Sequence, residues 1–389
     1  MIKSVVLKVF MQNSIFRLFS YYNKNKKHNN SKILLYNNSE FRDNVKALYD
    51  FIIEEGYNEK YEIVCSSNDY KEFKNEKYKN VRFVSNLKAV FEFLSSGYVY
   101  YRAGKIPILP GKDQIVIQMW HGSPYKGGDD GMLKSHSWEH QYYTYAFSAS
   151  KNFASIWSRL FSMPLDHILI CGHPRCDALF KKWEKYDFGS YKKLILWTPT
   201  FKTSKHLGYN NVKTEHGIIP VVKAQHFKLL NEKLKSMDVK VVVKLHPAQD
   251  LDKYNLINMD HFILLSHKDF VKRSMDLYRF MTQCDALITD YSSIFYDYLL
   301  LDRPMAFTED DMEEYADLRG FAVDNPDAYK PGFRIKTEED LLKFVEDLVN
   351  DIDNYKNDRQ RVMDLANDYR SGDFCLRALN LAGIFIESD

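Results

Sequence analysis

Cysteine is scarce in this sequence, and its placement indicates neither a disulfide framework nor a zinc site. The five cysteines are scattered, their number is odd, and no CxxC pair occurs. They stand at positions 65, 171, 176, 284 and 375. A protein of the reducing cytoplasm fits this pattern best.

Long hydrophobic runs and a charge bias are missing as well. No run of 18 apolar residues occurs, which excludes an ordinary transmembrane helix. The apolar start is interrupted by Lys8, Gln12, Asn13 and Arg17 and has no small-residue cleavage site, so we expect no signal peptide. The 54 Lys and Arg nearly balance the 52 Asp and Glu, and no basic stripe with interleaved aromatics occurs. We therefore expect no nucleic-acid partner.

The N-terminal stretch lacks acidic residues, because no Asp or Glu occurs before Glu40. Apolar residues recur there at helical spacing, at Ile2, Val5, Val6 and Val9. Its positive charges are Lys3, Lys8, Arg17, Lys24, Lys26, Lys27 and Lys32. A basic amphipathic segment of this kind suits the interface of an anionic membrane; packing on the protein's own core is the alternative. We expect residues 1–31 to form this segment and to lie on a membrane surface.

The length of 389 residues exceeds what one core usually serves, so two domains are expected. From Lys32 onward, apolar β-branched runs alternate with segments of helical spacing, which predicts α/β domains with parallel, doubly wound sheets. The polar stretch KKWEKYDFGSYKK separates two such regions. The predicted Rossmann-like domains are 32–187 and 188–389, facing each other across a cleft. Three helices are expected to close the chain, and the last has the option of packing back on the N-terminal domain.

Two histidines stand at the ends of predicted strands. His121 closes the run IVIQMWH, and His246 closes VKVVVKLH. Because ligands bind at the carboxyl ends of strands in open α/β sheets, we expect each imidazole to face the cleft, one from each domain. Histidine suits proton transfer at neutral pH. A structural histidine that ends a turn is the alternative for each.

The surroundings of the two histidines add further candidates. His121 lies in the glycine-rich loop WHGSPYKGGDDG, where Lys126 could neutralise an acceptor phosphate. Gly122 and Ser123 of the same loop complete the expected acceptor contacts. Lys244 points to the same side of its strand as His246, so both could meet a diphosphate.

The segment DALITDYSSIFYDYLLL is the most readable ligand site. A strand is predicted to end at Thr289, Asp290 is placed to cap, and a helix is expected to begin about Ser292. Free amides at a helix N-terminus bind phosphate, and the hydroxyls of Ser292 and Ser293 can add donors. Simple helix capping by Asp and Ser is the alternative.

Weaker candidates follow other predicted strands. In WTPTFKTSK, Pro199 fixes a turn, and Thr200 and Lys202 are candidate contacts for a nucleotide or its phosphates. In GHPRCDAL, Arg175 would suit an anionic acceptor. The acidic run PMAFTEDDMEEY could supply a carboxylate to a ribose, and Arg377 of SGDFCLRAL is a further phosphate partner.

Taken in order, these segments resemble the CDP-glycerol glycerophosphotransferase family, bacterial enzymes that prime or polymerise teichoic acids and related capsules. The matching stretches, over roughly residues 32–389, are WHGSPYK, GHPRCD, ILWTPTFK, VKLHP, ITDYSSIFYDYLLLDRP, FTEDDMEEY and SGDFCLR. The resemblance implies a GT-B fold and transfer of a polyol phosphate from a CDP donor, with release of CMP. It also implies a peripheral place on the inner face of the bacterial cell membrane.

The resemblance also assigns roles. His121 would deprotonate the acceptor hydroxyl, and His246 would stabilise the donor diphosphate. Thr289, Asp290, Ser292 and Ser293 look like the family's phosphate-binding turn, Arg377 like its helper, and Asp311 like a carboxylate near the nucleotide. The expected reaction moves glycerol phosphate from CDP-glycerol to a lipid-linked saccharide or growing polymer.

No tightly bound cofactor and no metal are expected, because no DxD-type ligand pair has a clear role, although Mg²⁺ assistance stays open. Tyr125, Cys176 and the run SGDF depart from the family pattern, which affects acceptor identity more than fold. The alternatives are a CDP-ribitol-dependent transferase, a GT-B nucleotide-sugar glycosyltransferase or epimerase, and a non-enzymatic nucleotide-binding subunit. The sequence has no signal for a particular oligomeric state.

Overall fold

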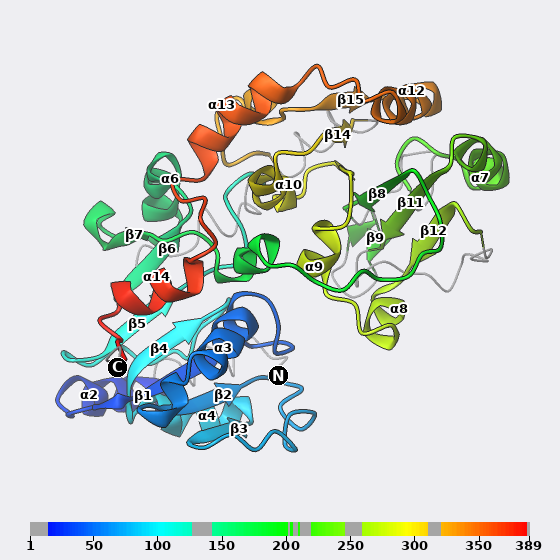
Figure 1. Ribbon diagram of the computed structural model, residues 1–389. Coiled ribbons are helices and arrows are strands. Elements are labelled where there is room, and N and C mark those ends of the chain that lie inside the picture. Colours follow the sequence, from blue (N-terminus) through cyan, green and yellow to red (C-terminus); the bar gives the residue numbers. More distant parts are fainter. Residues whose placement is uncertain are drawn as a thin grey trace. The chain divides into compact units, whose positions relative to one another are not determined.

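The computed structural model describes residues 15–126, 142–200, 203–204, 209–210, 219–245, 259–309 and 320–386. These residues form two compact units, each built on a parallel sheet (Figure 1). Unit 1 takes the described residues within 1–123, 131–177 and 367–389, and unit 2 takes those within 124–130 and 178–366. The prediction of two parallel α/β domains is confirmed. The two units interleave along the chain, since the last residues belong with the first unit.

Unit 1 is built on a seven-stranded sheet of order β3-β2-β1-β4-β5-β6-β7, in which every pairing is parallel. Its strands are β1 (Asn29–Tyr36), β2 (Glu62–Ser66), β3 (Val81–Val84), β4 (Ser96–Tyr101), β5 (Ile115–Gln118), β6 (Tyr145–Ser148) and β7 (Ile168–Ile170). Its α-helices are α2 (Ile15–Lys24), α3 (Asn44–Glu54), α4 (Asn86–Phe93), α6 (Lys151–Phe161) and α14 (Phe374–Leu381). Short 3₁₀ segments are η1 (Tyr57–Glu59), η3 (Leu165–His167) and η4 (Pro174–Phe180), the last of which runs on into unit 2. The strand order reverses between β1 and β4, which is where ligands bind in folds of this type.

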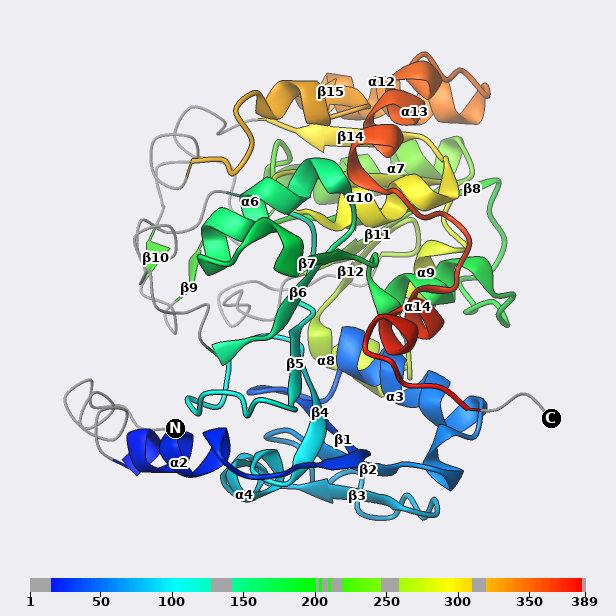
Figure 2. The same cartoon turned by 90° about the vertical axis from the view of Figure 1, so that its left-hand side faces the viewer.

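The core of unit 1 lies between one face of the sheet and the helices α3 and α14. Apolar side chains of β1, β2, β4 and β5 pack there against α3 and against Cys375, Ala378 and Leu379 of α14. Gly172 allows the close approach of α14: its φ is +90°, and an added Cβ would collide with the ring of Phe374. Helix α4 lies on the opposite side of β1 from α3 (Figure 2).

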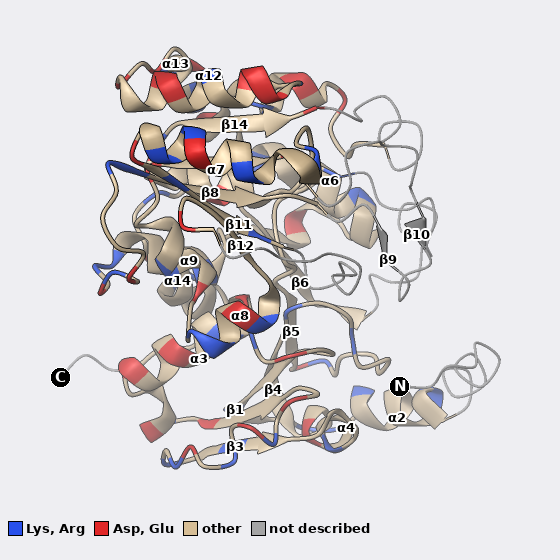
Figure 3. Cartoon of the chain, turned by 90° about the vertical axis from the view of Figure 1, so that its right-hand side faces the viewer, with Lys and Arg blue, Asp and Glu red and all other residues tan. Residues whose placement is uncertain are grey.

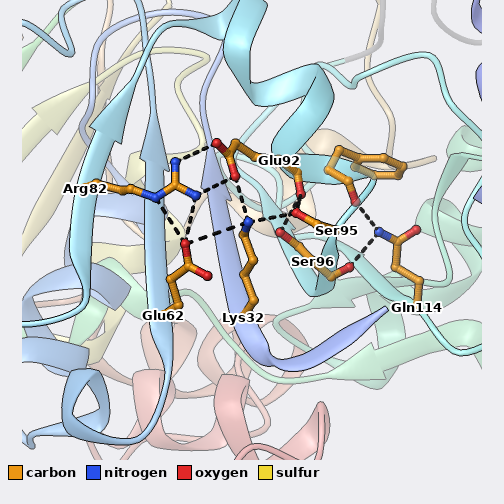
Figure 4. A network of polar contacts seen from close by, with 8 residues as sticks. Lys32, Glu62, Arg82, Glu92, Ser95, Ser96 and Gln114 are labelled. Carbon is orange, nitrogen blue, oxygen red and sulfur yellow. Dashed lines mark hydrogen bonds and ion pairs between the residues drawn. The ribbon is translucent and has the colours of Figure 1, made fainter. Parts of the chain in front are cut away.

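Helix α4 is fixed to the sheet by a network of charged side chains (Figure 4). Lys32 of β1, with a side chain that is only 7% exposed, donates to Glu92 of α4 at 2.7 Å. Arg82 of β3 donates to the carboxylates of Glu92 at 2.6 Å and of Glu62 at 2.8 Å. Because the charges alternate in sign and several bonds converge on one carboxylate, the network holds three strands and one helix in fixed positions.

Helix α2 is attached to unit 1 through polar groups. The side-chain amide of Asn23 donates to the Leu109 carbonyl and to Gln114 Oε1, each at 2.9 Å. The buried ring of His28 contacts Asp113 Oδ1 through Nδ1 at 2.6 Å and Asn23 Oδ1 through Nε2 at 2.8 Å. The described part of the N-terminal segment is therefore bound to the first sheet, with β1 already beginning at Asn29.

Unit 2 repeats the same architecture with a six-stranded parallel sheet of order β12-β11-β8-β13-β14-β15. Its strands are β8 (Lys193–Thr198), β11 (Val239–Lys244), β12 (Phe262–Leu265), β13 (Ala286–Thr289), β14 (Met305–Thr308) and β15 (Phe333–Ile335), with a separate antiparallel pair, β9 (Thr203–Ser204) and β10 (Tyr209–Asn210). Its helices are α7 (Phe227–Ser236), α8 (His267–Lys272), α9 (Leu277–Met281), α10 (Ile294–Tyr298), α12 (Glu338–Val349) and α13 (Lys356–Ala366), with the 3₁₀ segments η5 (Ala224–His226), η6 (Leu299–Leu301) and η7 (Pro326–Tyr329). Helices α7 and α12 pack on one face of the sheet. Its order reverses between β8 and β13.

Some local predictions differ from the structure. The short strands β12 and β15 were not expected. The helix expected to begin about Ser292 is the five-residue α10, beginning at Ile294 and continued by η6. Among the described helices, none combines the length and apolarity required to span a bilayer.

Candidate functional site

The strand-order reversal of unit 1 brings together a carboxylate and two arginines. Asp43 caps α3, which follows β1, and its side chain accepts from the Asn44 amide at 2.9 Å. Arg102, directly after β4, donates through Nε to Asp43 Oδ2 at 2.9 Å. Arg175 of η4 donates to Asp43 Oδ1 at 2.6 Å. Burial opposes ionisation of Asp43, but Arg175 and Arg102 outweigh it and hold the pKa of Asp43 well below its ordinary value.

The backbone around His121 is in unusual conformations. Trp120 has φ +58° and Gly122 has φ +148°, so the residues on both sides of His121 lie in a region that favours glycine. For a residue as bulky as tryptophan this conformation costs on the order of 1–3 kcal/mol. The Trp120 indole packs edge-on against Trp157 and Phe161, which holds the strained residue in place. Such strain is common next to residues that act on a ligand.

The His121 ring is exposed and stacks at a tilt on Trp120, with ring centroids 4.3 Å apart. Desolvation by the surrounding protein lowers the pKa of His121, the charges of Arg102 and Arg175 lower it further, and Asp43 raises it in part. The imidazole is therefore neutral at physiological pH and able to accept a proton.

The four predicted acceptor residues fall in different units. Gly122, Ser123 and Arg175 belong to unit 1, whereas Lys126 belongs to unit 2. The Ser123 hydroxyl lies 3.3 Å from Nε2 of the buried His173. Arg175 is also buried, and besides Asp43 it donates to the His121 carbonyl at 3.0 Å. These contacts make Arg175 a support of the His121 loop.

The strand-order reversal of unit 2 is built around Asp290. This carboxylate follows β13, is 3% exposed, and accepts from the Thr200 amide at 2.6 Å and from the Thr200 hydroxyl. It also accepts from the Tyr291 amide at 2.6 Å. Burial raises the pKa of Asp290, while the charge of Lys126 and the hydrogen bonds from Thr200 and Tyr291 oppose that rise. Asp290 thus holds the turns after β8 and β13 together.

Three other predicted residues lie near Asp290: Lys126, Pro199 and Thr289. Lys126 donates to the Thr200 hydroxyl at 3.3 Å, so a cation lies beside the place where the strand order of unit 2 reverses. The buried Pro199 precedes Thr200 in the turn. Thr289 donates to the Thr198 carbonyl at 3.0 Å, which makes its hydroxyl part of the strand ends.

Ser292 and Ser293 lie in the turn between β13 and α10 and are partly exposed. Ser293 occupies the cap position of α10 but makes no side-chain capping hydrogen bond. Lys244, at the end of β11, places its ammonium 5.3 Å from the centre of the Phe270 ring. Hydroxyls and a cation therefore stand at the carboxyl ends of β13 and β11 in unit 2.

Arg377 lies on α14 in unit 1, where it stacks on Tyr369 at 3.5 Å and pairs with Asp373 at 2.8 Å. The first amides of α14 are occupied, because the Asp177 carboxylate accepts from Phe374 and Cys375 at 2.8 and 2.9 Å. Asp177 therefore caps a helix far along the chain.

Three predicted site residues, His246, Lys202 and Asp311, lie outside the described residues. Within the described ranges, no group of three or more His, Cys, Asp and Glu side chains is arranged to hold a metal ion.

The sequence prediction did not include Asp43, Asn44, Arg102 or His173. In the sequence, Asp43 begins the run DNVKALYDFIIEE, which has helical spacing, and Arg102 ends the apolar run YVYYR. Their positions at the carboxyl ends of β1 and β4 were the signal that could have identified them.

The sequence and the fold of this chain are similar to those of known proteins. The family model described as CDP-glycerol:poly(glycerophosphate) glycerophosphotransferase matches residues 18–381. The chain belongs to this family. The resemblance predicted from the motifs is confirmed, and the chain is a member of a family of transferases.

The names of the curated relatives mention one of two polyol phosphates, ribitol phosphate or glycerol phosphate. A teichoic acid poly(ribitol-phosphate) polymerase of Bacillus spizizenii is 25% identical over 79% of this chain and 50% of its own length. A teichoic acid ribitol-phosphate primase of the same species is 29% identical over 66% of each chain. A teichoic acid glycerol-phosphate transferase of Staphylococcus aureus is 25% identical over 90% of this chain and 92% of its own. The chain thus spans half the length of the first relative and about two thirds of the second.

Solved structures show the fold. The wall teichoic acid polymerase TagF superposes with a TM-score of 0.73 at 20% identity, covering 97% of this chain and 94% of that chain. A UDP-N-acetylglucosamine 2-epimerase matches with a TM-score of 0.53 at 11% identity, over 93% of this chain and 99% of that one.

Proposed function

We propose that the chain transfers glycerol phosphate from CDP-glycerol to a lipid-linked saccharide or a growing teichoic-acid or capsule-type polymer, and releases CMP. In this reaction the acceptor hydroxyl oxygen forms a bond to the glycerol-bearing phosphorus. The bond from that phosphorus to the bridging oxygen of the diphosphate breaks, and CMP leaves. His121 takes the proton of the attacking hydroxyl.

The observation that carries this proposal is the state of His121. Its ring is exposed on a strained loop at the carboxyl end of a central strand, and its pKa is lowered, so it is neutral and able to accept a proton. A positioned general base of this kind contributes roughly 10²–10⁴-fold to the rate. Gly122 and Ser123 would contact the acceptor beside the ring.

Unit 2 is proposed to hold the CDP donor. Phosphoryl transfer requires positioning and charge stabilisation more than covalent help from the protein. The turns joined by Asp290 present the Thr200 region, Ser292 and Ser293 on the side of the sheet where ligands bind. Lys126, the predicted acceptor contact, lies beside Thr200. His246, Lys202, Lys244, Asp311 and Arg377 complete the proposed contacts. A TagF variant whose structure followed a soak with CDPG supports this donor class.

We further propose that the two units face each other across a cleft in the GT-B manner. No tightly bound cofactor or metal is proposed, and Mg²⁺ assistance is to be tested by adding a chelator to the assay.

The proposed place of the enzyme is the inner face of the cell membrane, bound peripherally to anionic lipid. Large apolar side chains of α2 and α4 are exposed, with Leu18 at 72%, Leu87 at 77% and Phe91 at 62%. The two helices contact each other through Phe19 and Phe91, whose ring centroids are 6.3 Å apart. Helix α2 has basic residues and no acidic one (Figure 3). Apolar side chains among basic ones suit an anionic interface.

The proposal is tested by incubating the purified chain with CDP-glycerol and candidate acceptors and measuring CMP release. His121→Ala should abolish release while the variant still unfolds at the wild-type temperature. His226→Ala is the matched control, because His226 is a solvent-exposed histidine of η5 that pairs with Glu338. Wild-type release by His121→Ala would remove the proposed base.

Transfer of ribitol phosphate from CDP-ribitol is the second candidate. It is supported by the ribitol-phosphate primase, which at 29% is slightly more similar than the glycerol-phosphate transferase at 25%. Parallel assays with CDP-glycerol and CDP-ribitol decide between them. Preferential binding of UDP-sugars in calorimetry would instead favour a nucleotide-sugar enzyme.

A further inference from the structure

Two consecutive carbonyl groups of the His121 loop are held by side chains from elsewhere in unit 1. The side-chain amide of Asn44 donates to the Trp120 carbonyl at 2.9 Å. The guanidinium of Arg175 donates to the His121 carbonyl at 3.0 Å. Asn44 and Arg175, which we call the clamp, also bind each other, because the Arg175 amide donates to Asn44 Oδ1 at 3.2 Å. The loop is thus fixed at the residue that bears the ring and at the one before it.

Asp43 is the residue on which this clamp depends. Its carboxylate accepts from Arg175 and Arg102 and from the first amide of α3, so it orients the guanidinium that reaches His121 and fixes the start of the helix that carries Asn44. Its side chain is only 11% exposed. Its φ of +67° with ψ of −146° belongs to a region used almost only by glycine. A simple helix cap has no need of such a backbone, since ordinary cap residues are extended.

We propose that Asp43 and Asn44 are positioning residues for His121, acting through Arg175 and the loop backbone to hold the imidazole in place for proton transfer. The inference rests on the proposed role of His121 as the base. Neither residue needs to contact donor or acceptor in this role. The aromatic contact with Trp120 holds one side of the ring, and the clamp prevents the strained backbone from relaxing away from it.

The same carboxylate adjusts the charge around the ring. Four groups from three parts of unit 1 act on His121: Arg102 after β4, Asp43 before α3, and Arg175 and His173 in and beside η4. Asp43 raises the pKa of His121, while Arg102, Arg175 and His173 lower it. Removing the negative charge of Asp43 should therefore shift protonation of His121 to lower pH, and removing the positive charge of Arg102 should shift it to higher pH.

The first test follows the His121 ring itself by NMR titration of histidine-labelled protein. In the wild type the midpoint should lie below the ordinary value of about 6.5. We expect a lower midpoint in Asp43→Asn and a higher one in Arg102→Gln. Identical midpoints in all three proteins would overturn the inference. If Asp43→Asn fails to fold, Asn44→Ala decides, because it removes the hydrogen bond to the Trp120 carbonyl without changing a charge, and wild-type kcat in that variant would overturn the positioning role.

The second test measures turnover. For Asp43→Asn and Asn44→Ala, kcat should fall roughly 10–100-fold while the KM for CDP-glycerol changes by less than about threefold, since a misplaced base slows chemistry without affecting donor binding. In Asp43→Asn the acid limb of the pH profile should move with the NMR midpoint. Asp69→Asn is the matched control, because Asp69 is a nearby loop carboxylate that accepts from the Phe41 amide.

The role of His121 as the base and the positioning role of Asp43 and Asn44 can be disproved separately. Wild-type kcat in Asp43→Asn, with His121→Ala inactive, would overturn the positioning role and leave the base in place. Full activity in His121→Ala would remove the base, and the positioning role with it. The NMR midpoints stand apart from both, because they require no turnover.

Discussion

The carboxylate of Asp290 accepts from both the backbone amide and the hydroxyl of Thr200, and so connects the carboxyl ends of the neighbouring strands β13 and β8. In unit 1 the same place, between β1 and β4, is bridged by Asp43 and Arg102. Each sheet thus has a carboxylate with little solvent exposure at the point where its strand order reverses. Since ligands of such folds bind there, each carboxylate shapes a binding edge without having to touch the ligand itself.

Replacement of Asp290 by alanine should damage the binding edge of unit 2. The buried amide of Tyr291 would lose its acceptor at a cost of about 1–3 kcal/mol, and the part-buried amide of Thr200 would lose its acceptor as well. We expect a higher KM for CDP-glycerol and a lower stability, measured by CMP release and urea unfolding. Asp285→Ala is the control, because Asp285 accepts from the Leu194 amide at the other end of the same strands. Equal effects of both variants on KM would contradict the assignment.

Unit 1 should lose stability in acid through the network of Figure 4. The hydrogen bonds from Arg82 outweigh burial and, with Lys32, lower the pKa of Glu92 to about 2. A carboxylate with a depressed pKa stabilises the fold above its unfolded value of about 4.3, and this contribution is lost as the pH falls towards 2. Glu92→Gln should therefore be less stable than the wild type at pH 7, and the difference should shrink by pH 2–3.

The measurement for Glu92 is urea unfolding of both proteins at several pH values. Glu59→Gln is the control, because Glu59 forms an exposed pair with Lys79 and such pairs contribute little. A difference between wild type and Glu92→Gln that does not change with pH would contradict the prediction.

Asp177 should stabilise the chain by capping α14 from η4. Since its carboxylate accepts from the amides of Phe374 and Cys375, Asp177→Ala should cost about 1–2 kcal/mol. Hydrogen exchange at the first turn of α14 should rise at the same time. Asp373→Ala, which removes the pair with Arg377 and the hydrogen bond from Ser371, should leave those amides protected.

The membrane surface proposed for α2 and α4 makes a prediction about vesicle binding. Leu18→Glu and Phe91→Glu place a charge among exposed apolar side chains, so both should weaken cosedimentation with anionic vesicles. Leu229→Glu is the control, because Leu229 is 54% exposed on α7 in unit 2. Unchanged sedimentation of both variants, or an equal loss with the control, would count against an interfacial role of this surface.

The sequence predicted the parts of the fold that are encoded locally. Runs such as those of β5 and β11 are apolar and β-branched because both faces of a parallel strand are buried, and this composition is readable without a structure. Strand β12 has a single β-branched residue, Ile263, and β15 is interrupted by Arg334, so neither shows this pattern. The helix expected about Ser292 begins later because the Asp290 side chain bonds Thr200 and Tyr291 in place of the amides of the helix.

The candidate site was predicted only in part for a similar reason. His121 is conspicuous because it ends an apolar run before a glycine. Asp43 and Arg102, by contrast, are 59 residues apart in sequence and meet only because β1 and β4 are neighbours in the sheet. The sequence likewise gave no sign that Asp177 caps a helix almost 200 residues further on, or that Arg175 would be occupied in supporting the His121 loop.

The most direct test of the account is the pH dependence of CMP release from CDP-glycerol by the wild type and by His121→Ala, measured with a competent acceptor and with donor binding followed separately by calorimetry. We predict that His121→Ala binds the donor as the wild type does but loses at least about 10²-fold in kcat at pH values above the acid limb of the wild type, as expected for loss of a general base. Wild-type kcat in this variant, with an unchanged acid limb, would contradict the proposed mechanism.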